Sequence, residues 1–532
     1  MKGVMPIRNL TQEALGATRL SASYCVIGAG PAGLAVATRL AAAGKHVVVL
    51  ESGFENFTAD THALNAIETR GAPYPGAMTG RYRGLGGSTS RWGGMLIPLA
   101  PHELAPRPYL SHAGWPLTHD VLRRYDGEIA RIFHLGEVSF AEEALAAADP
   151  ERLFQHDPDF NTRWVKVALP RQRKLQNLVA GVRDHKGPDV WLGATVTGFD
   201  LDKTSGRLLA VQARSLMGHC LTASANMFIL AAGTIETTRL LLLLDEHSGG
   251  QAFAHCQALG RYYQDHLDVK VGHLRPLDHE RVSRLFGIRF ERKLLRRVHL
   301  ELSPAAQAAD HVSGAFAHVE LNIQDQPSLS LLARKFEERQ PRFSAAELMT
   351  LWAERGIVAK VAYSRLANGS LPILKGSDPH LRICIEQAPH VDNRLVLSRE
   401  KDALGVPKAC LRWRPIDLDE RTFRACSDRL RAFWSRSGLS RLCHVVWDPI
   451  VTNPALHFIP HARDYYHPSG TTRMGTNPRT SVVNPDLRCH FVPNLHVVSA
   501  STFPTAGVSN PTLTLMQLAL RCADHLCAFD PA

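Results

Sequence analysis

The sequence lacks paired cysteine motifs, although its 532 residues include ten cysteines. They are spread from Cys25 to Cys527, and no two are separated by only two residues. This spacing argues against a zinc ribbon and against an iron–sulfur binding motif. The simplest interpretation is a set of free, mostly buried thiols in a reducing compartment.

Long apolar runs are also missing. The longest, such as Leu240–Leu244, are far shorter than the about 20 residues that a membrane-spanning helix needs. Residues 1–20 lack the apolar core and the cleavage pattern of a secretory signal, and we interpret them as an N-terminal extension. We therefore expect no membrane span and a soluble, cytoplasmic protein.

The chain has no run of five or more consecutive basic residues, although Lys and Arg exceed Asp and Glu by 61 − 50 = 11. The densest basic stretch, Arg281–Arg297, is interleaved with apolar residues, which is typical of a solvated amphipathic face. Since only the net charge suggests nucleic-acid binding and no recognised motif supports it, we expect no nucleic-acid partner. Internal repeats are absent as well, which argues against solenoids and propellers.

The clearest positive signal is a glycine fingerprint, Gly28-x-Gly30-x-x-Gly33, between an apolar strand and a helical pattern. Gly28 permits a tight turn, Gly30 lets the backbone approach a pyrophosphate, and Gly33 allows close packing of the helix on the sheet. The next apolar strand, 47–50, leads into Glu51, eighteen residues after Gly33, whose carboxylate can accept hydrogen bonds from ribose hydroxyls. The fingerprint predicts a dinucleotide site and leaves NAD and FAD both open.

A second glycine cluster lies within residues 55–115, a long stretch with weak periodicity. Its centre, residues 84–94, contains five glycines among eleven residues. Such a long irregular stretch in a compact protein is either functional or wrongly assigned. We interpret residues 84–94 as an amide-rich loop whose backbone can approach a flat or anionic ligand, with a plain surface loop as the alternative.

Four blocks in this order resemble the glucose–methanol–choline (GMC) family of flavin-dependent alcohol oxidoreductases. They are the fingerprint, residues 84–94, Ala232–Leu241, and the run from His467 to Asn510. The resemblance is closest to the sugar-oxidising branch, which comprises pyranose oxidases and bacterial FAD-dependent sugar dehydrogenases. The segments that carry this closer resemblance are Tyr465–Gly475, Phe503–Thr514 and Glu386–Arg394.

The resemblance implies an α/β fold in which a doubly wound FAD-binding domain accompanies a substrate domain with a mixed β-sheet and helices. We expect residues 21–270 and 455–532 to form the FAD-binding domain. Residues 271–454 are then the substrate-binding domain. The implied cofactor is FAD, and no metal is implied.

The resemblance also implies which further residues contact FAD: Gly86, Gly87, Ser88, Trp92, Gly93, Val196, Ala232, Gly233, Ser499, Ala500, Thr512 and Leu513. In pyranose oxidases a histidine at the place of Arg91 carries a covalent link to the flavin. Because this chain has arginine there, we expect non-covalent FAD. The pair Asp265–His266 resembles a family segment near the cofactor, and we interpret it as structural.

Two C-terminal residues match the active-site positions of the family. His467 opens the pattern His-x-x-Gly-Thr-x-Arg-Met-Gly, and Asn510 stands at the second position, which is His or Asn in the family. Histidine, with an unperturbed pKa near 6.5, suits a general base at neutral pH. The asparagine amide can hold a substrate oxygen as negative charge grows on it.

The function implied is oxidation of an alcohol group, expected to belong to a sugar, sugar-like or glycoside substrate, by hydride transfer to flavin N5 with His467 as base. The electrons then pass to O₂ or to another acceptor. Alternatives that stay open are a non-sugar alcohol of secondary metabolism, a flavin-containing lyase and a non-catalytic flavin-binding scaffold. The exact substrate, the acceptor and the oligomeric state stay open as well.

Overall fold

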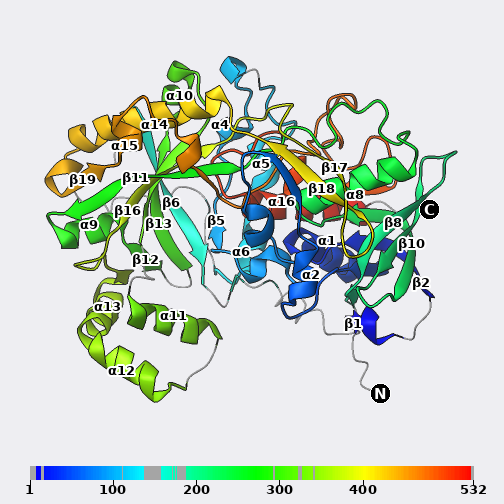
Figure 1. The fold of residues 1–532 in the computed structure, drawn as a ribbon, viewed down its shortest axis with the longest axis horizontal. Helices are drawn as coiled ribbons and strands as arrows, with labels where there is room; N and C mark the ends of the chain where they lie inside the picture. The colour runs from blue at the N-terminus through cyan, green and yellow to red at the C-terminus, as the bar shows by residue number, and fades with distance from the viewer. Residues whose placement is uncertain are drawn as a thin grey trace.

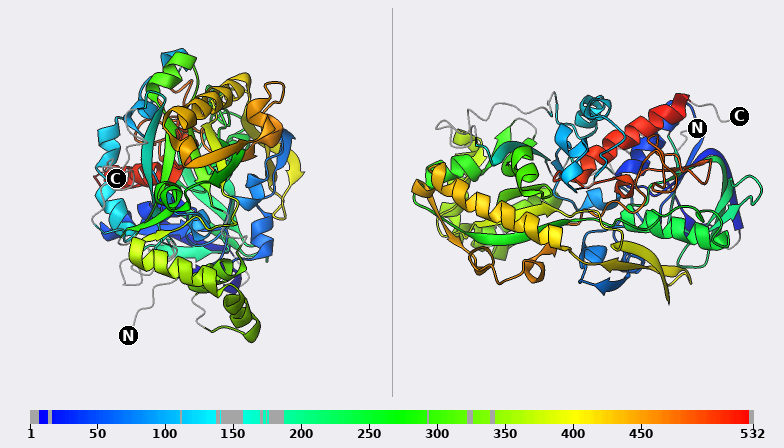
Figure 2. Two further views of the ribbon diagram at one scale, coloured as in Figure 1. Left: turned by 90° about the vertical axis from the view of Figure 1, so that its left-hand side faces the viewer. Right: turned by 90° about the horizontal axis from the view of Figure 1, so that it is seen from above.

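The computed structural model describes residues 7–13, 17–110, 112–136, 140, 157–169, 172–173, 175, 187–291, 294–321, 326–338 and 342–528. The described strands form three sheets, and the two large ones lie toward opposite ends of an elongated molecule (Figure 1, Figure 2). The predicted α/β fold class is confirmed.

The first sheet has eight strands and a mostly parallel core. Its order is β1 (Ile7–Asn9), β7 (Asp189–Leu192), β3 (Val47–Leu50), β2 (Ala17–Ile27), β10 (Cys220–Leu230), β9 (Leu208–Arg214) and β8 (Thr195–Leu201), with β21 (Leu495–Val497) beside β10. The strands from β1 to β10 pair in parallel, and β9 and β8 add an antiparallel edge. All four residues of β3 are buried apolar residues, as expected for a strand that is covered on both faces.

Helix α1 (Pro31–Ala42), which follows β2, and helix α16 (Pro511–Ala528), the last described helix of the chain, pack against each other beside this sheet. Helix α1 begins with a proline, whose missing N–H costs nothing at that position. Helix α16 packs along α1, and its Leu513 and Met516 belong to the same hydrophobic core as Leu34. The two ends of the chain thus share one core.

All described pairings in the second large sheet are antiparallel, so the mixed sheet expected for the substrate domain is not what the structure has. Its order is β15 (Ser370–Leu371), β12 (Ile288–Glu291), β13 (Leu294–Leu302), β14 (Ala315–Glu320), β16 (His380–Glu386), β11 (His266–Pro276) and β19 (Cys443–Trp447), with β6 (Phe160–Ala168) on β13, β5 (Met95–Leu96) on β6 and β20 (Arg463–Asp464) on β11. This sheet therefore takes strands from outside residues 271–454. The limits expected for the two domains stay a prediction.

The two faces of the second sheet differ in polarity because side chains alternate along each strand. In β14, Ala315, Ala317 and Val319 belong to a hydrophobic core that packs under helix α14 (Asp417–Arg436). Phe316 and His318 point to the opposite face. That opposite face carries a network of polar groups that begins near residue 266.

A third sheet and shorter elements complete the described part of the chain. The third sheet joins β17 (Arg394–Lys401), β18 (Pro407–Trp413) and β4 (Glu68–Gly71). Helices α11, α12 and α13 form an arm that lies apart from the body in Figure 1. The three helices of the arm are α11 (Pro327–Glu338), α12 (Ala345–Ala353) and α13 (Arg355–Asn368). The remaining described α-helices are α2 (Ala59–Ala63), α3 (Gly76–Thr79), α4 (Pro101–Leu104), α5 (His119–Arg123), α6 (Asp126–Ile132), α8 (Thr234–His247), α9 (His279–Phe286), α10 (Pro304–Asp310) and α15 (Pro449–Thr452).

The cysteines and the helices bear on two expectations from composition. All ten cysteines are free thiols, and most of them are buried, as predicted. Among the helices of the described ranges, none combines the length and the apolar character that crossing a bilayer requires.

Candidate active site

The glycine fingerprint forms the turn between β2 and α1. Gly28 has φ 103°, and a Cβ there would lie 2.7 Å from the carbonyl oxygen of Ala231. A Cβ on Gly33 would lie 1.9 Å from the carbonyl oxygen of Gly28, so only glycine allows α1 to approach the strand this closely. Gly30, in contrast, has only one atom within 4 Å of such a Cβ, at 3.9 Å. The turn is therefore tightly packed at Gly28 and Gly33 and open at Gly30.

Glu51 follows β3 and lies directly beside this turn. Its Oε2 accepts a hydrogen bond from the backbone N–H of Ala29 at 2.8 Å, and its Oε1 accepts one from Gly53 at 2.8 Å. Burial raises the pKa of this carboxyl against the effect of these bonds. Glu51 therefore fixes the turn through both of its carboxylate oxygens.

The loop 84–94 packs on the fingerprint. The N–H of Gly86 donates to the carbonyl of Ala29 at 2.9 Å, and a Cβ on Gly87 would lie 2.9 Å from the Cα of Gly30. Ser88 bonds within the loop region, since its Oγ accepts from the N–H of Tyr82 at 3.2 Å. Trp92 donates from its indole N–H to the carbonyl of Arg173 at 2.9 Å. A Cβ on Gly93 would meet nothing within 4 Å, so the loop is open at this residue.

The other residues expected to contact FAD lie in two groups. Val196 is buried in β8, while Ala232 and Gly233 connect the end of β10 to α8, where Gly233 is open toward solvent. Ser499 and Ala500 follow β21, and Thr512 and Leu513 lie in the first turn of α16. Ser499, Ala500, Thr512, Leu513 and the end of β10 all lie at the carboxyl ends of the parallel strands of the first sheet. Open α/β sheets bind their ligands at this position.

His467 and Asn510 lie side by side, although 43 residues separate them in the sequence. Nε2 of His467 is 3.1 Å from Nδ2 of Asn510, the residue that precedes helix α16. Burial, together with the neighbouring His266, lowers the pKa of His467 well below its usual value. The ring is therefore neutral at pH 7 and has a lone pair available for a proton.

The pair Asp265–His266 makes direct contact with His467. Nδ1 of His266 is 2.9 Å from Nδ1 of His467, and the two rings are perpendicular. Oδ1 of Asp265 accepts the backbone N–H of His266 at 2.7 Å and that of His467 at 2.8 Å. The interpretation of this pair as structural overlooked the contact between the imidazoles. The available signal was a carboxyl and an imidazole, Asp265 and His266, at the start of a strand in which polar and apolar residues alternate.

Three side chains hold the loop that leads to Asn510. The N–H groups of Ala506, Gly507 and Val508 donate to Gln264 at 2.9 Å, Glu386 at 2.9 Å and Glu103 at 2.6 Å, respectively. Sequence reasoning assigned no such role to these three acceptors. No local sequence pattern predicts this role, because the three acceptors come from distant parts of the chain.

The carboxylate of Glu386 is also paired with a buried cation. Its two oxygens accept hydrogen bonds from Arg107 at 2.6 and 2.7 Å, and both side chains are almost fully buried. Burial alone would raise the pKa of Glu386, but Arg107 and the backbone amides outweigh it and lower the pKa to about 2.

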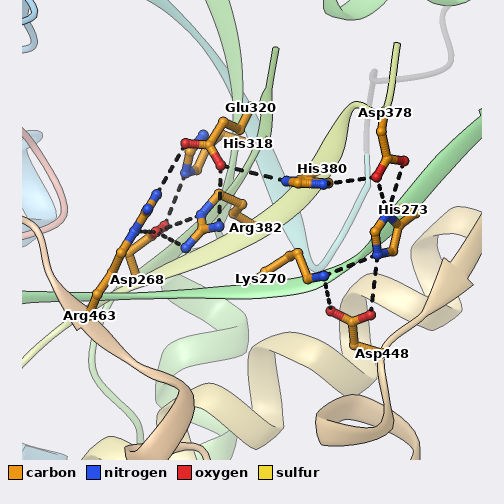
Figure 3. A network of polar contacts seen from close by, with 10 residues as sticks. All are labelled: Asp268, Lys270, His273, His318, Glu320, Asp378, His380, Arg382, Asp448 and Arg463. Carbon is orange, nitrogen blue, oxygen red and sulfur yellow. Dashed lines mark hydrogen bonds and ion pairs between the residues drawn. The ribbon is translucent and has the colours of Figure 1, made fainter. Parts of the chain in front are cut away.

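The polar face of the second sheet continues from the imidazole pair. Asp268, two residues after His266, is buried and binds Arg382, Arg463 and His318. Burial opposes its ionisation, but His318 and Arg382 outweigh burial and lower the pKa of Asp268 to about 2. Figure 3 shows how acidic and basic side chains alternate from there across the sheet toward His273.

At the far end of this network, His273, Asp378 and His380 have the residue types of a metal site. The carboxylate of Asp378 is 2.8 Å from Nδ1 of His273 and 3.1 Å from Nε2 of His380. However, Arg275 also binds Asp378 at 2.7 Å, and the amine of Lys270 is 3.1 Å from Nε2 of His273. These cations already neutralise the cluster. The absence of a metal centre stays a prediction.

Comparisons with known proteins agree with this geometry. A family model described as GMC oxidoreductase matches residues 389–519, and one described as NAD(P)-binding Rossmann-like domain matches residues 26–56. A 2-methyl-1,2-propanediol dehydrogenase from Mycolicibacterium austroafricanum is 24% identical, and the match covers 94% of each chain. The chain is thus similar to GMC oxidoreductases over residues 389–519 and to a diol dehydrogenase along nearly all of its length.

Partial relatives and solved structures extend this result. Paromamine 6′-oxidase of Streptomyces fradiae is 33% identical over 25% of this chain and 23% of its own length. The structure of pyridoxine 4-oxidase from Mesorbium loti has a TM-score of 0.59 at 17% identity, over 96% of this chain and 100% of that one. A structure of formate oxidase has a TM-score of 0.59 at 16% identity, over 96% of this chain and 99% of that one. These two structures bear on the fold.

The protein is an FAD-dependent enzyme that acts on alcohols. Its residues fit the cofactor. A glycine turn that is open at Gly30 suits the close approach of a diphosphate, and the start of α1 favours negative charge. Glu51, the residue expected to accept from ribose hydroxyls, lies beside it, and Gly233 leaves the backbone open at the strand end. Which residues touch FAD stays a prediction.

Proposed function

We propose that this enzyme oxidises a hydroxyl group of a sugar, sugar-like or glycoside substrate, with His467 as the base and Asn510 as its positioning partner. The observation that carries the proposal is the contact of Nε2 of His467 with Nδ2 of Asn510 at 3.1 Å. When bound, FAD supplies the acceptor for the hydride that leaves the substrate carbon. We also propose that FAD is bound without a covalent link.

His467 and Asn510 are sufficient to remove the proton of the substrate hydroxyl. The substrate hydroxyl takes the place of the Asn510 N–H at Nε2 of His467 and accepts a hydrogen bond from that amide, and its proton moves to Nε2. Because burial keeps His467 neutral at pH 7, no prior deprotonation of the ring is needed. The amide N–H of Asn510 then stabilises the negative charge that develops on the substrate oxygen.

Two observations support a polyhydroxylated substrate. Partial relatives include paromamine 6′-oxidase and a C-glycoside 3-oxidase of Arthrobacter globiformis, which is 31% identical over 29% of this chain. The sheet face that borders His467 also offers hydrogen-bonding side chains, among them His318, whose ring lies 6.2 Å from that of Tyr465. Tyr465 in turn lies 5.3 Å from His467.

The experiment is anaerobic mixing of the purified flavoprotein with pyranoses, glycosides, aminoglycosides and short 1,2-diols. We expect rapid loss of flavin absorbance with a member of the first three groups and recovery on exposure to air or to an added acceptor. His467→Ala slows flavin reduction by about 10²–10⁴-fold, the usual contribution of a general base. Bleaching by the diols alone contradicts the sugar assignment, and an unimpaired His467→Ala contradicts the base.

A further inference from the structure

His266 occupies a position between the backbone and the proposed base. It begins β11, is 1% exposed, and uses both of its ring nitrogens. Nε2 lies 2.7 Å from the carbonyl oxygen of Gly507, and Nδ1 lies 2.9 Å from Nδ1 of His467. The two contacts have different chemistry, because a carbonyl only accepts, whereas an imidazole nitrogen donates or accepts according to its tautomer.

The carbonyl of Gly507 determines the direction of the whole chain of hydrogen bonds. Nε2 of His266 must carry a proton in order to donate to it. Burial lowers the pKa of His266, so the ring is neutral and its Nδ1 is an acceptor. Nδ1 of His467 must then carry the proton of that contact, which leaves the lone pair of His467 on Nε2.

The contact on the other side of His467 agrees with this direction. Nδ2 of Asn510, which only donates, lies 3.1 Å from Nε2 of His467. A proton on Nε2 would place two donors against each other there. The backbone carbonyl, the two imidazoles and the amide are thus compatible with one tautomer of His467, the one with a proton on Nδ1 and an unprotonated Nε2 that accepts from Asn510.

We propose that His266 is a positioning residue that fixes the tautomer and the ring orientation of His467. It holds the lone pair on the nitrogen that faces Asn510. This inference rests on the proposed role of His467 as the base. When the substrate proton reaches Nε2, the ring of His467 becomes positively charged, and its Nδ1–H continues to donate to the neutral His266. The proton count of His266 does not change during the step.

The carbonyl that orients His266 is itself held firmly. The N–H of Gly507 donates to Glu386, and the neighbouring N–H groups donate to Gln264 and Glu103. Gly507 has φ 64°, and a Cβ there would lie 2.4 Å from Leu99, so the peptide has little room to turn. The direction of the hydrogen bonds therefore starts from a fixed backbone group.

Two matched substitutions test the two ring nitrogens of His266 separately, because each keeps one of its two contacts and removes the other. In His266→Asn, the side-chain oxygen takes the place of Nδ1 and still accepts from His467, but the contact with Gly507 is lost. In His266→Gln, the longer amide reaches the carbonyl of Gly507 and the acceptor for His467 is lost. His266→Ala removes both contacts.

We expect His266→Ala and His266→Gln to slow flavin reduction by about 10²-fold or more, with little change in the substrate dissociation constant, because the base then populates the wrong tautomer. His266→Asn rescues most of that loss. A purely structural role predicts the opposite order, since His266→Gln preserves the contact with the backbone. The flavin spectrum and the thermal midpoint of each variant establish that it is folded and loaded.

A second measurement does not depend on activity. In holoenzyme labelled with ¹⁵N-histidine, the signal absent from His467→Ala identifies His467 among the 26 histidines. We expect a protonated Nδ1 and an unprotonated Nε2 in the parent and in His266→Asn, and a mixture of tautomers in His266→Gln. A protonated Nε2 in the parent, or equal rates for His266→Asn and His266→Gln, overturns the role of His266. A fully active His467→Ala instead overturns the proposed base.

Discussion

The pair Arg107–Glu386 offers a quantitative test of how the active-site loop is held. Glu386 binds Arg107 through both oxygens and also accepts the N–H groups of Gly507 and Gly314 at 2.9 and 3.1 Å. Glu386→Gln keeps the shape of the side chain but removes the charge. It leaves a buried guanidinium without a counter-charge and turns an amide N–H₂ toward groups that donate.

Two estimates of the cost agree in size. The pKa of Glu386 falls from 4.5 to about 2 on folding, which corresponds to about 3 kcal/mol at 1.36 kcal/mol per pKa unit. Breaking a buried pair by removing one partner usually costs about 3–5 kcal/mol. Because the folded-state pKa is lowered, this stabilisation is present above pH 4.5 and is lost as the pH falls through about 2.

Urea unfolding of the holoenzyme at neutral pH, followed by tryptophan fluorescence, measures the effect. We expect Glu386→Gln to lose about 3–5 kcal/mol, and the double variant Arg107→Met/Glu386→Gln to lose less than the two single changes together. The control is Glu280→Gln, which breaks an exposed pair with Arg284 and changes stability little. Equal midpoints for Glu386→Gln and Glu280→Gln refute the reasoning.

Two further predictions concern the groups around the imidazole pair and the cofactor. Burial raises the pKa of Asp265 to about 7, so the folded state retains a proton that the unfolded state releases, and stability falls as the pH rises from about 4 to 7. Asp265→Asn flattens this dependence, and thermal midpoints of both proteins measured across that range check it; parallel curves contradict it. We expect acid precipitation to release all of the FAD into the supernatant. Arg91, which stands where a histidine would carry the covalent link, lies over the rings of Phe57 and Tyr82 and forms no bond to the flavin. Flavin that stays with the precipitated protein contradicts non-covalent binding.

The sequence is most informative where the backbone itself dictates the residue type. The turn at Gly28 needs a positive φ, and the approach of α1 excludes a side chain at Gly33, so the spacing of these glycines alone indicates the turn. The next apolar run, residues 47–50, likewise forms the buried strand β3 directly before Glu51. In each case the signal is local, because it depends on neighbours within a few residues.

The second sheet is much harder to predict. Strand β6 pairs with β13 along its whole length, yet the two are more than a hundred residues apart, and β5 joins them from the glycine-rich region. Hydrophobic alternation indicates that a strand exists but does not specify its partner. Residues 55–115, expected to be irregular, contain several short helices and β4, which pairs with β18. These elements are too short to produce a periodic pattern.

The active site shows the same distinction at the level of single side chains. A family motif indicates His467 and Asn510, whereas no motif indicates that Gln264, Glu103 and Glu386 bind the loop 506–508. A loop without a strand partner still needs acceptors for its buried N–H groups, because an unpaired buried N–H costs about 1–3 kcal/mol. Side chains from distant segments supply these acceptors here, and only the folded chain brings them together.

This arrangement explains why so much charge is buried beside a base that must stay neutral. Glu386 is matched by Arg107, and Asp268 by Arg382, so the sheet face contains fixed ion pairs instead of isolated charges. An isolated carboxylate near His467 would favour the protonated imidazole, which cannot act as a base. The neighbouring carboxyl of Asp265 directs its oxygen to backbone amides and has a raised pKa. The imidazole pair is therefore surrounded by groups that hold the backbone in place without stabilising a proton on the ring.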